Sequence, residues 1–122
     1  ETDARSYTQS TMSYISMVGL QASVKEITQL NPSKIEEHTN LLGDLFVNLM
    51  EKTKWMPWSK GGKSYYARHI ISLESDMDSL DRALNKLRIQ NIICSSRNGR
   101  IRFSLAHYNN ENDIKRVVQA LT

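Results

Sequence analysis

The chain has 122 residues, of which 39% are hydrophobic and 24% are charged, so it has the composition of one ordinary globular domain with a single core. Its 16 basic and 13 acidic residues give a net charge of +3 and are interspersed without a run of five like charges, which argues against a nucleic-acid-binding surface. No stretch approaches the roughly 18 apolar residues of a membrane span, no signal segment is visible, and the single cysteine excludes an internal disulfide, so we expect a soluble, cytoplasmic protein.

Two helices are predicted in the first half of the chain, on either side of Pro32. Apolar residues recur at helical spacing before and after this proline, which cannot continue a helix. Ser33 and Glu36 match the capping-box pattern S-x-x-E at the start of the second helix. We expect an extended lead-in over residues 1–10 and a helical hairpin over residues 11–53. Because the chain opens without an initiator methionine, we interpret it as a fragment of a longer protein.

A loop is predicted next, at KWMPWSKGGKS, because Pro57 and the glycine pair after it break regular structure. Trp55 and Trp58 are its notable residues. Tryptophans in a basic loop can stack on bases or on a flat ligand, and they can also close the edge of a core. We favour packing for this pair.

The second half of the chain is predicted to form a β-α-β-β-α unit over residues 65–122. The segment YYARHIISLES has the β-branched and aromatic composition of a strand, and a helix follows it after a cap region at Ser75–Asp78. Near the end, Asn110 is placed to cap a last helix that has Asp113 in its first turn.

A β-hairpin is predicted over residues 91–106, because Asn98-Gly99 is a preferred pair for a type I′ turn and alternating runs flank it. Arg102 points to the side opposite its apolar neighbours on the second strand. The predicted fold is α+β in the order α-α-β-α-β-β-α, with a small three-stranded, mainly antiparallel sheet and helices packed on one face. Arg102 then lies on the other face.

The residues themselves do not assemble a complete catalytic set or a metal site. His38, His69 and His107 lack a partner at ligand spacing, and Cys94 lies within an apolar strand, where a buried thiol is the simpler interpretation. Arg102 is different, because a guanidinium fixed on a strand can hold a carboxylate through two parallel hydrogen bonds. It can equally pair with an acidic side chain of a neighbouring element, and the spacing leaves both interpretations open.

The stretch SSRNGRIRFSLAHYNNENDIKRVVQAL, residues 95–121, resembles the C-terminal signature of the class V aminotransferase and cysteine desulfurase family of pyridoxal-phosphate enzymes. In that signature an arginine-x-serine strand, here beginning at Arg102, leads to the pair Tyr108-Asn109 and to a helix with an acidic first turn, here Asp113. STMSYISMVGL is similar to the family's glycine-threonine segment, and ARHIISLES resembles the first strand of its small domain.

The resemblance implies that Arg102 grips the α-carboxylate of an amino-acid substrate and that Thr11 reaches the phosphate of pyridoxal phosphate in the neighbouring subunit's site. It also implies a large cofactor-binding domain, a homodimer, and a small domain that is inactive alone, since the family's Schiff-base lysine is not among these residues. Ser104 and Tyr108-Asn109 would support the strand end. Cys94 is too close to Arg102 for a desulfurase cysteine, which leaves aminotransferase or other lyase chemistry.

An alternative from a different class is an autonomous α+β module that binds a ligand or nucleic acid through Trp55, Trp58 and nearby lysines. Salt-sensitive binding of single-stranded nucleic acid would favour this alternative.

Overall fold

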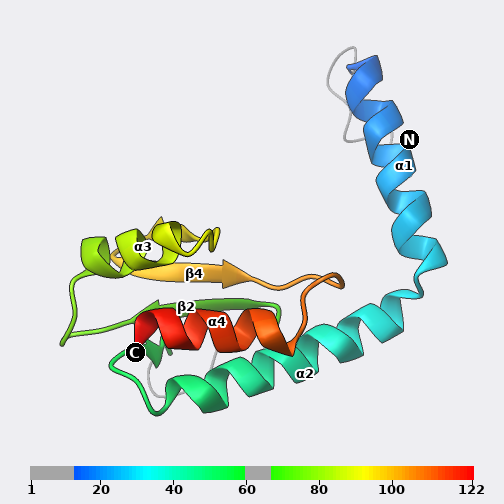
Figure 1. Cartoon of the computed structure of the whole chain (residues 1–122). Coiled ribbons are helices and arrows are strands. Elements are labelled where there is room, and N and C mark those ends of the chain that lie inside the picture. Colours follow the sequence, from blue (N-terminus) through cyan, green and yellow to red (C-terminus); the bar gives the residue numbers. More distant parts are fainter. Residues whose placement is uncertain (1–12, 60–66) are drawn as a thin grey trace. The chain divides into compact units, whose positions relative to one another are not determined.

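A computed structural model describes residues 13–59 and 67–122 of the chain, which divides into the units Glu1–Lys34 and Ile35–Thr122. The elements are α1 (Tyr14–Gln29), α2 (Pro32–Met50), β1 (Met56–Pro57), β2 (Ile70–Glu74), α3 (Leu80–Ile89), β3 (Ser95–Arg97), β4 (Arg100–Ser104) and α4 (Glu111–Leu121) (Figure 1). In the described part of the chain, no helix has both the length and the apolar character needed to cross a membrane.

The first two helices meet at Asn31, which has a positive φ of 63°. Its side-chain oxygen accepts a hydrogen bond from the backbone N–H of Ser33 at 3.2 Å. α2 therefore begins at Pro32, one residue before the predicted capping box. A proline is favoured at the first helical position because its missing N–H would have no partner inside the helix.

Within the described residues, the sheet has four antiparallel strands in the order β1-β2-β4-β3, so the predicted three-stranded sheet is wrong. The additional strand is β1, within the tryptophan loop, and it changes the order of elements to α-α-β-β-α-β-β-α. The Trp58 N–H extends this pairing with a 2.8 Å hydrogen bond to the carbonyl of Ser72. The sequence does not predict β1, because a strand of two residues is too short to show an alternating pattern. Pro57 is tolerated there because β1 lies at the edge of the sheet.

The core covers one face of this sheet, as predicted. Ile71 and Leu73 of β2 lie opposite Phe103 and Ile101 of β4, and all four side chains are buried. They form one cluster with buried residues of α2, α3 and α4, namely Leu42, Phe46, Met50, Ala83, Leu87, Ile114, Val117, Ala120 and Leu121. The rings of Phe46 and Phe103 meet edge to face at 5.2 Å. The opposite face carries the alternate residues of β2 and β4.

Trp55 belongs to this core and is only 1% exposed, which confirms the packing interpretation for this residue. Its Nε1 has no hydrogen-bond partner among the residues that the structure describes, although the indole lies near enough to Asp78 to contribute to lowering the pKa of that carboxyl. The tryptophan thus closes the edge of the core beside β1.

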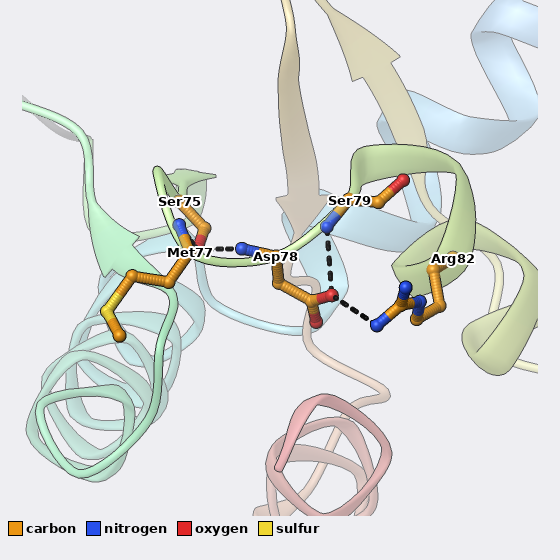
Figure 2. A network of polar contacts seen from close by, with 5 residues as sticks. All are labelled: Ser75, Met77, Asp78, Ser79 and Arg82. Carbon is orange, nitrogen blue, oxygen red and sulfur yellow. Dashed lines mark hydrogen bonds and ion pairs between the residues drawn. The ribbon is translucent and has the colours of Figure 1, made fainter.

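The start of α3 is organised by the predicted cap region, and Figure 2 shows its polar contacts. The Ser75 hydroxyl accepts hydrogen bonds from the N–H groups of Met77 and Asp78, both at 3.1 Å. The Asp78 carboxylate accepts from the Ser79 N–H at 2.8 Å and lies 3.7 Å from the Arg82 guanidinium. These contacts turn the chain from β2 into α3.

The hairpin turn is as predicted, with positive φ angles of 50° at Asn98 and 75° at Gly99. The paired part of the hairpin is shorter than predicted, because β3 covers only Ser95–Arg97. Residues 91–94 precede it without strand pairing to β4.

Candidate ligand cavity beside Arg102

Arg102 lies in the middle of β4, on the sheet face opposite the core. Its cross-strand neighbours are Ser72 in β2 and Ser95 in β3. Because the residues before and after it are buried, the alternation predicted from the sequence is confirmed at this position. Neither neighbouring serine carries a charge that would pair with the guanidinium.

The Nε of Arg102 is buried and has no hydrogen-bond partner, and Arg102 forms no ion pair within residues 13–59 and 67–122. Arg100, two residues earlier on the same strand, provides a contrast. Its Nε lies 2.9 Å from Glu74, and its guanidinium lies 4.5 Å from the centroid of the Trp58 ring. The pairing with an acidic side chain that the sequence left open is therefore found at Arg100 and not at Arg102.

A cavity of about 540 Å³ adjoins Arg102, where residues 91–94 separate from β4. Its apolar lining residues come from α2, β4, α4 and the segments that flank the strands: Phe46, Ile92, Phe103, Leu105, Ile114 and Val117. Small-molecule sites in proteins commonly have volumes of about 300 to 1,000 Å³ and mostly apolar walls with a few polar groups. The cavity has that size. Its walls are about evenly polar and apolar, since Asn91, Ser95, Ser104, Tyr108 and Asn109 line it beside three charged residues.

Three charged side chains line the cavity, and two of them are already engaged. Arg116 donates to the carbonyl of Gln90 at 2.9 Å. Asp113 accepts from the Asn110 N–H at 3.1 Å and from the side-chain amide of Asn109 at 3.3 Å. Of the three, Arg102 alone lacks a partner among the residues that the structure describes, so the cavity favours an anionic group at that end.

Asn109 joins the end of β4 to α2 and α4. Its side-chain oxygen accepts from the Ala106 N–H at 2.9 Å, and its carbonyl accepts from His38 Nε2 at 2.8 Å. The sequence alone does not indicate the His38 contact, because 71 residues separate its partners. Tyr108 is 75% exposed, lines the cavity, and lies edge to face on His107, at 5.3 Å between ring centroids.

Comparison of the sequence with models of known protein families gives no match, and neither does comparison with curated proteins. The resemblance to the class V aminotransferases therefore rests on the residues quoted for it.

The other predicted site residues are placed as follows. Thr11 lies outside the described residues. Cys94 lines the cavity, and burial raises the pKa of its thiol.

The two tryptophans do not form an exposed stacking pair for nucleic acid. Trp55 is buried in the core, and the Trp58 ring is covered by the guanidinium of Arg100. In the part of the chain that the structure describes, no three His, Cys, Asp or Glu side chains are grouped to hold a metal ion.

Pyridoxal phosphate does not fit the described cavity residues. The cofactor needs a lysine amine for its aldehyde and donors for its phosphate. No lysine is among the cavity residues described, and Lys25 and Lys34 are exposed on α1 and α2. The cavity instead contains an arginine that can bind a carboxylate, and a carboxylate is a group found in an amino-acid substrate.

Proposed function

We propose that this chain is the C-terminal small domain of a pyridoxal-phosphate enzyme of the class V aminotransferase type, and that Arg102 holds the α-carboxylate of its amino-acid substrate. The observation that carries the proposal is the buried, unpartnered Nε of Arg102 beside a cavity. A buried donor without a partner costs about 1 to 3 kcal/mol, and a carboxylate matches the planar fork of the guanidinium. The resemblance over residues 95–121 supports the same role.

On this proposal the chain's own residues bind the substrate and position the strand that binds it. Arg102 binds and orients the carboxylate, and Asn109 with His38 fixes the end of the strand that carries Arg102. On this proposal a large domain outside the described residues would hold pyridoxal phosphate, which would supply an electron sink for chemistry at the substrate's α-carbon. The proposal includes a homodimer, with Thr11 at the cofactor phosphate of the neighbouring subunit, and a cytoplasmic location. On this proposal the chain alone is inactive.

The test is Arg102→Ala in the enzyme as its gene encodes it. We expect KM for the amino acid to rise about tenfold to a hundredfold, which corresponds to a charged hydrogen-bonded pair of about 1.5 to 3 kcal/mol. The absorbance of bound pyridoxal phosphate should not change, because the arginine contacts the substrate. Arg97→Ala is the matched control, since Arg97 is exposed on β3 and does not line the cavity.

Two results would count against the proposal in different ways. An unchanged KM in Arg102→Ala would exclude the carboxylate role. A gene product without any absorbance of bound pyridoxal phosphate would exclude the family assignment.

A further inference from the structure

We propose that the cavity beside Arg102 receives an apolar side chain of the bound carboxylate, so that the ligand is an amino acid or 2-oxo acid with a large aliphatic or aromatic side chain. This inference rests on the proposed carboxylate role of Arg102 and adds the class of side chain.

The residues that line the cavity come from both faces of the sheet. Arg102 and Ser95 belong to the face away from the core, whereas Phe46 and Phe103 belong to the core. All four line one cavity, because residues 91–94 do not continue the β3 pairing along β4. A ligand held at Arg102 therefore has a path between the chain segments to apolar side chains.

The walls of the cavity combine one cation without a partner in the described residues with several apolar side chains. Arg102 is the lining charge without a partner, so it provides for one anionic group. Phe103, Leu105 and Val117 also line the cavity, and their side chains offer no hydrogen-bonding group. The other lining cation, Arg116, is held by the carbonyl of Gln90, and the carboxylate of Asp113 repels a second anion. Burying an unpaired charge there is costly, whereas burying apolar surface is favourable. The cavity thus favours a monocarboxylate with an apolar tail over a dicarboxylate.

The experiment uses the chain itself and three probes: acetate, succinate and 3-phenylpropionate. Binding is followed by NMR titration and by protection of Cys94, the single cysteine, from alkylation by iodoacetamide. Because Cys94 lines the cavity, its alkylation reports occupancy without requiring enzyme activity. We expect 3-phenylpropionate to bind at least about tenfold more tightly than acetate and to slow alkylation, and succinate to bind no more tightly than acetate.

Variants separate the two ends of the site. Arg102→Gln should weaken the binding of both acetate and 3-phenylpropionate, and Arg97→Gln should leave both unchanged. Leu105→Phe adds volume to the cavity and should remove the preference for 3-phenylpropionate while acetate binding persists. If Leu105→Phe does not fold, Cys94→Phe fills the same cavity from the partly buried segment before β3, with NMR as the readout.

Each outcome bears on one of the two proposals. If acetate and 3-phenylpropionate bind equally and both depend on Arg102, the apolar pocket is wrong and the carboxylate role stands. If succinate binds more tightly than acetate, the proposed apolar pocket is also wrong. If no probe depends on Arg102, the carboxylate role fails and the inference fails with it.

Discussion

Arg100 and Arg102 lie two residues apart on the same face of β4, yet their surroundings differ. Arg100 is held between Glu74 and Trp58, whereas the cross-strand neighbours of Arg102 are two serines. The alternation of the strand predicted that both arginines share a face. Which of them is paired depends on the register of β2 and on the position of β1, and both are set by contacts distant in sequence.

At the same scale, Asp78 links stability to pH. The hydrogen bond from the Ser79 N–H is the main cause that lowers the pKa of Asp78, with a smaller contribution from Arg82, while desolvation acts in the opposite direction. A lowered pKa in the folded state stabilises the fold above the ordinary carboxyl pKa of about 4, and this contribution is lost as the pH falls through the folded-state pKa.

We therefore expect Asp78→Asn to lower Tm at neutral pH, and the difference from the unchanged protein to shrink as the pH falls below about 4. Thermal unfolding followed by circular dichroism between pH 3 and pH 7 measures it. Asp76→Asn is the control, because Asp76 is exposed in the same loop and makes none of these contacts within the described structure. A difference that is constant across this pH range would contradict the linkage.

At the scale of elements, α4 has the most complete local signal. The Asn110 side chain accepts from the N–H groups of Asn112 and Asp113, and the Asp113 side chain accepts from the Asn110 N–H, which makes a reciprocal capping box. The sequence predicted this cap because all its partners lie within four consecutive residues. The same junction positions Asn109 and therefore the end of β4 beside the cavity.

Asn110→Ala should reduce the free energy of unfolding by about 1 kcal/mol, since the N-terminal N–H groups of α4 lose their acceptor. Urea denaturation measures the change. Asn112→Ala is the matched control, because Asn112 is exposed in the first turn of the same helix and its backbone N–H, not its side chain, takes part in the cap. Equal losses in the two variants would show that the cap has no special role.

At the scale of the whole molecule, Gly43 marks a close approach between α2 and the chain before β2. A Cβ atom at this position would overlap the carbonyl oxygen of Arg68 and lie 2.9 Å from its carbonyl carbon. Both are backbone atoms, so the overlap can be relieved only by moving the backbone of α2 or of the segment before β2. The core residues of α2, such as Phe46, are positioned by this approach.

Gly43→Ala should therefore destabilise the fold by about 1 to 3 kcal/mol, the range for overpacking, although alanine is the better helix former. Gly19→Ala in α1 should have the opposite sign and stabilise by up to about 1 kcal/mol, because a Cβ there meets nothing within 4 Å. Denaturant unfolding of both variants gives the comparison. A stabilised Gly43→Ala protein would be inconsistent with the close approach.

The sequence by itself determined the features whose causes are local. Within the described residues, the helices follow from apolar periodicity, the turn at Asn98-Gly99 from the conformations that these residues tolerate, and the cap of α4 from short-range hydrogen bonds. The capping box predicted to begin at Ser33 is wrong, because α2 begins at Pro32 and the Asn31 side chain accepts from the Ser33 N–H. The burial of Ile101 and Phe103, with Arg102 between them on the other face, follows from the two-residue period of a strand.

Only the tertiary structure decided the rest, because those features depend on partners far apart in the chain. β1 is a strand only because the edge of β2 is available to Met56 and Pro57. The cavity exists because the pairing of β3 with β4 ends at Ser95 and Arg102, while β4 continues to Ser104. Arg102 has no acidic partner in the described residues because its neighbours on β2 and β3 are serines. A local pattern carries no information about register or neighbouring strands, since these are fixed by the packing of the whole core.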